Sequence, residues 1–295
     1  MNFIFYWEVP ILKREWLQQL PLKNIVNVQA VGGGDVNQAY RVQTKEKTYF
    51  LLVQPQADKS FYEGEIAGLN DFKRAGVLAP EVIANGRINS DAYLLLNYLE
   101  QGNGSQADLG RLVAKLHQVK SPNSKFGYSF PYSGSSITLD NTWSTSWIEL
   151  FVGKRLDVLA AAIERKGLWN EEDKNFYLQI RPKIIHLLEE HHSQPVLLHG
   201  DLWGGNYLFL ADKRPALIDP AAFFGDREFD IGVTTVFGGF SKQFYQSYMK
   251  VLPLTKGYEQ RLDLYRLYYL MLHLNKFGSS YAGGVTRLLQ EIKTS

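Results

Sequence analysis

In the first third of the chain, apolar and β-branched side chains occur in short runs that glycines or charged residues interrupt. Runs of this length with turn residues between them are typical of a small antiparallel sheet. A helix interrupts the runs, because Ser60 and Glu63 have the spacing of a capping box at the start of residues 61–74. The runs that predict strands are residues 25–31, 39–43, 48–53, 82–84 and 92–98.

Beyond residue 105 the apolar positions change to a helical period. Apolar side chains at positions 109, 112, 113 and 116 predict a helix over residues 106–120 that is buried on one side. The aromatic side chains of the last predicted helix are expected in the core. Further helices are predicted at residues 147–166, 171–191 and 258–277. The pattern predicts an α+β protein with a strand-rich N-terminal lobe, residues 1–97, and a larger, mainly helical lobe, residues 98–295.

The composition is that of an ordinary globular protein, with 45% hydrophobic and 21% charged residues in a chain of 295. No run approaches the roughly 18 apolar residues of a membrane-spanning helix, and the apolar start of the chain lacks a basic leader. The net charge of +2 supplies no broad positive field for nucleic acid, and the absence of cysteine excludes thiol chemistry. We therefore expect a cytoplasmic, monomeric protein that acts on small molecules rather than on nucleic acids or membranes.

A cluster of polar residues follows a short apolar run that ends at residue 198. The segment after Asn206 is typical of a β-hairpin that ends at Asp219, with its turn centred between Asp212 and Lys213. This turn would place Asn206 directly opposite Asp219, with Cβ atoms roughly 5 Å apart. An amide oxygen and a carboxylate are suitable ligands for Mg²⁺, which keeps water and substrate phosphates as its other ligands. The spacing predicts a magnesium site of the kind that phosphoryl transfer needs.

Asp201 lies in the same loop, five residues before Asn206, and is the predicted catalytic base. A carboxylate at this point can accept a hydrogen bond from a substrate hydroxyl and align it with the γ-phosphate of ATP. Gly204 and Gly205 allow the loop to turn tightly. We interpret His199 as a hydrogen-bonded scaffold residue of the loop rather than a base or a metal ligand. The set predicts a kinase that phosphorylates an alcohol.

The segment from His199 to Asn206, followed by residues 218–230, resembles the fructosamine kinase (ketosamine 3-kinase) family, a branch of the aminoglycoside-phosphotransferase-like kinases. Residues 32–37, 61–69 and 143–156 are also similar to segments of this family, so the resemblance covers nearly the whole chain. It implies a bilobal protein-kinase-like fold that binds ATP and Mg²⁺ between its lobes. The substrates that it implies are ketosamines, free or on proteins, which are phosphorylated at the sugar 3-hydroxyl. The phosphorylated adduct is then unstable, and the sugar is lost from the amine.

The resemblance also implies roles for individual residues. Asp201 would be the base, Asn206 and Asp219 would bind Mg²⁺, and Asp230 would brace the catalytic loop. Candidate substrate contacts are Trp203, Trp143 and Trp147, since a sugar can stack on an aromatic face. The nucleotide would contact a glycine loop, a helix glutamate and the hinge between the lobes, which correspond to Gly32, Gly33, Gly34, Asn37, Glu65, Asn97, Tyr98 and Leu99.

The third strand departs from the pattern of this fold. Kinases of the fold carry a lysine there that holds the nucleotide phosphates and pairs with a glutamate on the next helix. In this chain Leu52 occupies that position, so Glu65 loses its partner, and Lys47 would point from the opposite face of the strand. Two alternatives therefore stay open: a kinase of the same fold for another alcohol, such as an aminoglycoside or choline, and a nucleotide-binding protein with little turnover.

Overall fold

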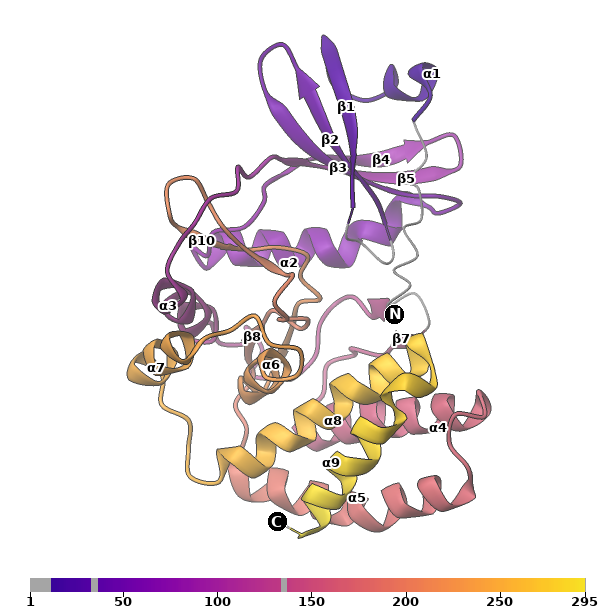
Figure 1. The fold of residues 1–295 in the computed structure, drawn as a ribbon, viewed down its shortest axis with the longest axis vertical. Helices are drawn as coiled ribbons and strands as arrows, with labels where there is room; N and C mark the ends of the chain where they lie inside the picture. The colour runs from indigo at the N-terminus through magenta and orange to yellow at the C-terminus, as the bar shows by residue number, and fades with distance from the viewer. Residues whose placement is uncertain (1–11, 33–36, 134–136, 295) are drawn as a thin grey trace.

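The computed structural model describes residues 12–32, 37–133 and 137–294. The N-terminal part forms a five-stranded antiparallel sheet with the order β1-β2-β3-β5-β4 (Figure 1). A short helix, α1 (Arg14–Leu17), precedes the sheet. All five predicted strands are present, and most extend by a few residues beyond the predicted bounds. Their bounds are β1 (Ile25–Val31), β2 (Gln38–Thr44), β3 (Thr48–Gln54), β4 (Val82–Ile88) and β5 (Asp91–Asn97).

Helix α2 (Glu63–Arg74) lies between β3 and β4 in the chain and begins later than the sequence pattern predicts. A 3₁₀ turn, η1 (Lys59–Tyr62), comes before it, and the carboxylate of Asp58 caps this turn by accepting a hydrogen bond from the Ser60 N–H at 3.2 Å. The predicted cap at Ser60 is therefore wrong. Asp58 takes the capping position because its side chain reaches the first free backbone N–H of the turn.

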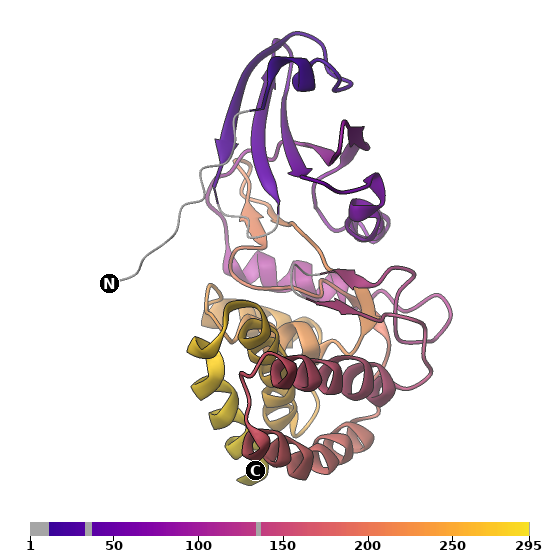
Figure 2. The same ribbon diagram turned by 90° about the vertical axis from the view of Figure 1, so that its right-hand side faces the viewer.

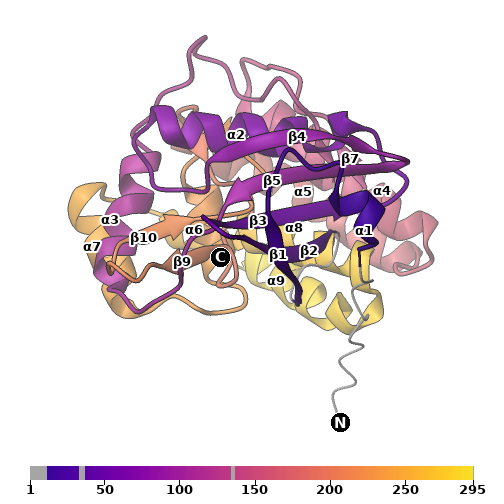
Figure 3. The same cartoon turned by 90° about the horizontal axis from the view of Figure 1, so that it is seen from above.

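The two faces of the sheet pack against different partners. Tyr40, Val42 and Leu51 point to the outer face, where they join a cluster with Trp16 of α1. Ala39, Leu52, Leu94 and Leu96 point to the inner face and pack with Tyr62 and Leu69 of the η1–α2 segment. The period of two along each strand produces this division. Seen from above, the sheet and α2 lie over the helices of the second lobe (Figure 3).

The second lobe is mainly helical and lies below the sheet in Figure 2. The predicted helices at 171–191 and 258–277 have these bounds in the structure. The helix predicted over 106–120 ends at Leu116, and the one predicted over 147–166 is a π-helical segment that continues as an α-helix. The bounds are α3 (Gln106–Leu116), η2 (Glu149–Leu156), α4 (Asp157–Arg165), α5 (Glu171–His191), α6 (Glu228–Thr234), α7 (Lys242–Val251), α8 (Tyr258–Phe277), η3 (Ser279–Tyr281) and α9 (Ala282–Thr294).

Besides the five-stranded sheet, the described part of the chain contains three two-stranded ladders, and all of them follow α3 in the chain. Strand β8 (Val196–Leu198) pairs with β11 (Phe223–Gly225), and β9 (Tyr207–Phe209) pairs with β10 (Pro215–Leu217). The third ladder joins β6 (Tyr132–Ser133) to β7 (Thr138–Leu139). No helix in the described part of the chain is long and apolar enough to cross a membrane.

Helix α2 contacts the second lobe directly as well as the sheet. A Cβ atom at Gly68 would lie 2.9 Å from the Cβ of Ala222 and 3.2 Å from the ring of Pro220, so glycine is needed for the close approach. The Asp71 carboxylate accepts a hydrogen bond from the Tyr128 hydroxyl at 2.5 Å. These contacts attach α2 to the segment that follows Asp219 and hold the two lobes in a defined relation.

Candidate active site

The backbone of the loop that follows β8 is hydrogen-bonded to Asp230, a fully buried residue of α6. Its carboxylate accepts hydrogen bonds from the backbone N–H groups of His199 at 2.7 Å and Gly200 at 3.0 Å. The ring of His117 contributes a third contact at 3.0 Å. Gly200 has a φ of +83°, and a Cβ there would lie 2.0 Å from the Ala221 carbonyl oxygen, so only glycine fits. This arrangement fixes the backbone immediately before Asp201.

His199 connects the loop to the neighbouring hairpin. Its Nδ1 accepts a hydrogen bond from the Asp201 N–H at 3.3 Å, which leaves Nε2 to donate to the Ile218 carbonyl at 2.9 Å. Burial lowers the pKa of His199, so the ring is held in the neutral form that this pattern requires. Both nitrogens are occupied by backbone groups, which supports the interpretation of His199 as a scaffold residue.

Two side chains hold the carboxylate of Asp201. The Tyr269 hydroxyl donates to Oδ1 at 2.7 Å, and the Asn206 amide nitrogen donates to Oδ2 at 3.1 Å. Burial raises the pKa of Asp201, and the two hydrogen bonds oppose this effect because they stabilise the charged form. The carboxylate is thus oriented from both sides.

The side chain of Asn206 has a defined orientation. Its amide nitrogen also donates to the Asp201 backbone carbonyl at 2.8 Å, so both hydrogen bonds of this nitrogen point toward the loop that carries Asp201. The amide oxygen then faces the other way and is available to a cation. The backbone of Asn206 accepts a hydrogen bond from the Ile218 N–H at 3.0 Å. Asp219 follows directly, in the left-handed region with a φ of +52°.

The hairpin register differs by one residue from the prediction. Leu217 pairs with Tyr207, and the Leu210 N–H bonds to the Arg214 carbonyl, so the loop contains three residues instead of two. Lys213 adopts a left-handed conformation with a φ of +72°, as is common in three-residue hairpin loops. The predicted pairing of Asn206 with Asp219 is therefore wrong, and Asn206 lies opposite Ile218.

Three carboxyl groups gather at this end of the hairpin. Burial and the charge of Asp201 raise the pKa of Asp219 to about 6. Burial and the charge of Asp219 raise the pKa of Glu65 well above its usual range. Carboxylates that repel one another in this way are stabilised by a divalent cation, and the amide oxygen of Asn206 completes an oxygen donor set. The residues present therefore fit Mg²⁺, with Asn206 and Asp219 as the groups to hold it.

We expect the requirement for Mg²⁺ to increase in acid. Asp219 binds a cation as the carboxylate, and a pKa of about 6 means that the proton competes for it as the pH falls through that value. The Mg²⁺ concentration that gives half-maximal activity should rise roughly fourfold between about pH 7.5 and about pH 5.5. Titrations of activity with Mg²⁺ at fixed ATP would measure this shift. An unchanged midpoint across this range would contradict the assignment of Asp219.

The nucleotide side of the site is described in part. Of the predicted glycine loop, Gly32 and Asn37 belong to the described residues, and Gly33 and Gly34 lie outside them. Asn97 ends β5, and its side chain accepts a hydrogen bond from the Glu81 N–H at 2.6 Å. Tyr98 follows, with the guanidinium of Arg41 5.1 Å from the centre of its ring, and Leu99 starts the linker. Asn97, Tyr98 and Leu99 thus lie where β5 ends and the chain continues toward α3, and their role as a hinge stays a prediction.

The structure separates the three tryptophans that were candidate substrate contacts. Trp203 belongs to the catalytic loop and is 38% exposed, with its ring over the backbone of Gly205. Trp143 packs on Phe224, at 5.8 Å between ring centres. Trp147 is only 4% exposed and donates its indole N–H to the Tyr265 hydroxyl at 3.1 Å. Trp147 is thus part of the core, and Trp203 is the one of the three that lies beside Asp201 in the chain.

Several residues near Asp201 were not identified from the sequence. Tyr269 is one of them, because the aromatic residues of α8 had been assigned to the core as a group. Tyr132 is another: burial raises its pKa, and the charges of Tyr268, Asp201 and Asp219 add to this effect. Tyr132 therefore lies near enough to the candidate carboxylates Asp201 and Asp219 to be affected by their charges. The hydroxyl groups of these tyrosines were the signal in the sequence that could have indicated polar contacts, since a buried tyrosine normally has a polar partner.

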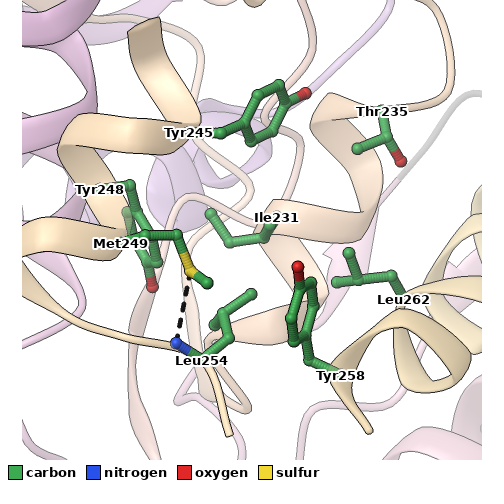
Figure 4. Close-up of a pocket in the computed structure, with 8 residues that line it drawn as sticks. All are labelled: Ile231, Thr235, Tyr245, Tyr248, Met249, Leu254, Tyr258 and Leu262. Atoms are coloured by element: carbon green, nitrogen blue, oxygen red, sulfur yellow. Dashed lines mark hydrogen bonds between the residues drawn. The ribbon is translucent and has the colours of Figure 1, made fainter. Parts of the chain in front are cut away.

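A separate apolar cavity of about 190 Å³ lies between α6, α7 and α8 (Figure 4). None of the residues that line it belongs to the site around Asp201, and its lining is almost entirely apolar. The lining residues are Ile231, Thr235, Tyr245, Tyr248, Met249, Leu254, Tyr258 and Leu262. This cavity is smaller than the usual range for small-molecule sites and carries no group suited to phosphoryl transfer.

Comparison with known proteins identifies close relatives over the full length. A Staphylococcus aureus protein named as a probable ketoamine kinase is 54% identical over 282 residues, covering 95% of this chain and 98% of the relative. A chloroplastic protein-ribulosamine 3-kinase of Arabidopsis thaliana is 32% identical, covering 94% and 86%. A crystal structure from Haemophilus somnus, named "Putative fructosamine-3-kinase", superposes with a TM-score of 0.81 at 27% identity, covering 91% of each chain.

More distant structures share the fold. Aminoglycoside phosphotransferase APH(4)-Ia superposes with a TM-score of 0.62 at 16% identity, over 90% of this chain and 94% of the other. The bilobal kinase-like fold is therefore common to both groups. The fructosamine kinase family model matches residues 11–295. With the catalytic loop, the acidic cluster and the whole-length relatives in agreement, the chain belongs to the fructosamine kinase family and is an ATP-dependent phosphotransferase.

Proposed function

We propose that this enzyme transfers the γ-phosphate of ATP to the 3-hydroxyl of a ketosamine, such as a ribulosamine or a fructosamine. The observation that carries the proposal is the Asp201 carboxylate, held by Tyr269 and Asn206 at the start of a loop that is braced from below. The names of the Staphylococcus aureus and Arabidopsis thaliana relatives support a ketosamine as the acceptor. We place the nucleotide between an N-terminal lobe, residues 1–97, and a C-terminal lobe, residues 98–295.

In the proposed reaction the substrate hydroxyl oxygen forms a bond to the γ-phosphorus while the bond from that phosphorus to the β–γ bridging oxygen breaks. Asp201 accepts a hydrogen bond from the hydroxyl and receives its proton as the new ester forms. Asn206 and Asp219 would hold Mg²⁺, which when bound supplies positive charge to the phosphates of ATP. Tyr269 and Asn206 keep Asp201 in position, so the hydroxyl meets an oriented acceptor.

The chemistry of the product explains the consequence of the reaction. A ketosamine has its carbonyl at carbon 2, so a phosphate on the carbon 3 oxygen lies next to the carbonyl and is a good leaving group. Loss of phosphate by elimination then makes the sugar labile, and the amine is released. The proposed function is therefore deglycation, either of free amines or of lysine side chains on proteins.

The test is phosphate transfer from Mg-ATP to synthetic ribulosamine and fructosamine, with the position of the phosphate determined by NMR. We expect transfer to carbon 3 of a ketosamine and release of the free amine from the product. An aminoglycoside and choline serve as control acceptors, because they are the alcohols expected for other kinases of the same fold. Transfer to one of these controls but to no ketosamine would refute the proposed substrate, while Mg-ADP binding measured in parallel would still report an intact nucleotide site.

A further inference from the structure

The contact between the sheet and α2 is apolar at the position where other kinases of this fold use an ion pair. Leu52 is buried on the inner face of β3, in one cluster with Tyr62, Ile66 and Leu69 of the η1–α2 segment. A well-packed apolar contact can replace a buried ion pair at no cost in stability. Glu65 lies near the charge of Asp219 rather than near a strand lysine, because Leu52 occupies that position. The helix is therefore attached to β3 by packing.

A polar link joins the same segment to the beginning of β2. The Tyr62 hydroxyl donates a hydrogen bond to the Asn37 side-chain oxygen at 3.1 Å. Tyr62 is 1% exposed and forms the last residue of η1, directly before α2. Asn37 is the residue that connects the predicted nucleotide loop to β2. A side chain that is fixed at the start of α2 thus reaches the base of the loop that is expected to cover the phosphates.

Asn37 would be less restrained without this bond. It lies just outside β2, so the sheet ladder, whose first β2–β3 pair is Gln38 with Val53, does not include it. A buried tyrosine ring loses little conformational freedom when its hydroxyl bonds, because the surrounding cluster already holds the ring. The bond therefore transfers the rigidity of the η1–α2 junction to Asn37.

We propose that Tyr62 is a positioning residue for the nucleotide, because its hydroxyl holds Asn37 against the η1–α2 junction. Packing at Leu52 attaches the helix to β3, and the Tyr62 hydroxyl adds a polar link to the nucleotide side, where other kinases of this fold use a lysine–glutamate pair. The inference rests on the kinase assignment and on a nucleotide between the lobes, and it does not depend on which alcohol is the acceptor.

The test compares Tyr62→Phe with Tyr40→Phe. Both remove one hydroxyl from a buried tyrosine of the N-terminal lobe, but the Tyr40 hydroxyl bonds to Gln38 at 3.1 Å from the outer face of the sheet. Calorimetry with Mg-ADP should show about fivefold weaker binding for Tyr62→Phe, the effect of one net intramolecular hydrogen bond, and an unchanged constant for Tyr40→Phe. Steady-state kinetics should show the same rise in KM for ATP, with KM for the acceptor unchanged.

A double-mutant cycle with Asn37→Ala separates positioning from a general loss of stability. If the hydroxyl acts through Asn37, adding Tyr62→Phe to Asn37→Ala should weaken Mg-ADP binding no further. Equal effects of Tyr62→Phe in both backgrounds would overturn the proposal, as would an equal loss of affinity in Tyr40→Phe. Since Mg-ADP binding needs no acceptor, these outcomes are independent of the ketosamine assay.

Discussion

Asp201→Asn is expected to reduce kcat by about a thousandfold while leaving the fold and the binding of Mg-ADP intact. Asparagine is nearly the same size as aspartate and can keep a hydrogen bond with Tyr269, but it cannot accept the proton of the substrate hydroxyl. Loss of a positioned general base typically costs about 10²- to 10⁴-fold. The measurement is the rate of phosphate transfer at saturating ATP and acceptor, with Mg-ADP binding as the check on the nucleotide site.

Asp212→Asn is a matched control for this experiment. Asp212 lies in the loop of the neighbouring hairpin, where it is exposed and pairs with Arg214. The same change of one oxygen to an amide nitrogen should leave kcat within about twofold of the wild type, since an exposed ion pair contributes little to the stability of the fold. A rate for Asp201→Asn within about tenfold of the wild type would mean that another group accepts the proton.

Asp230→Asn is expected to have the largest effect on stability. The native carboxylate is buried and accepts bonds from two backbone N–H groups and from the ring of His117. An asparagine in its place removes the charge, and its amide group can no longer accept all of these donors. Leaving buried donors without their charged partner costs about 3 kcal/mol, which should lower the melting temperature by roughly 5–10 °C.

Thermal unfolding with and without Mg-ADP would measure this effect. We expect kcat to fall as well, because the bonds from Asp230 hold the backbone of His199 and Gly200 directly before Asp201. Asp108→Asn provides the comparison, since Asp108 is an exposed residue of α3 that pairs with Arg111 three residues away. A melting temperature for Asp230→Asn equal to that of Asp108→Asn would show that the hydrogen bonds of Asp230 contribute little to stability.

Much of the secondary structure could be predicted because the residues that determine it are close together in the chain. The strands of the N-terminal sheet follow from alternation and turn residues, and helix α8 has the bounds of its apolar pattern. The start of α2 was misplaced, because the chain first forms the 3₁₀ turn η1, which Asp58 caps, and α2 begins only after this turn. The hairpin register was wrong because a three-residue loop and a two-residue loop differ by one residue in the same polar segment.

The candidate site divides in the same way. Asp201, Asn206 and Asp219 could be predicted as site residues from the sequence because one loop and one hairpin carry all three, so their spacing is informative. The partner of Asp201 was not found, since Tyr269 lies 68 residues further along the chain. The sequence does not distinguish Trp147 from Trp203, because both are tryptophans. Packing places Trp147 in the core, whereas Trp203 is partly exposed in the loop that carries Asp201.

The sequence by itself determined the fold class, the family resemblance and the candidate reactive groups, because these depend on local patterns and on residue types at short spacing. The tertiary structure decided which groups surround those residues. It brought Tyr269 of α8 and Tyr132 close to Asp201. It also placed Leu52 in an apolar contact with the η1–α2 segment, whose Tyr62 reaches Asn37. Contacts of this kind depend on how helices and strands that are distant in the chain pack together, and packing is specified by the whole set of side chains rather than by any local pattern.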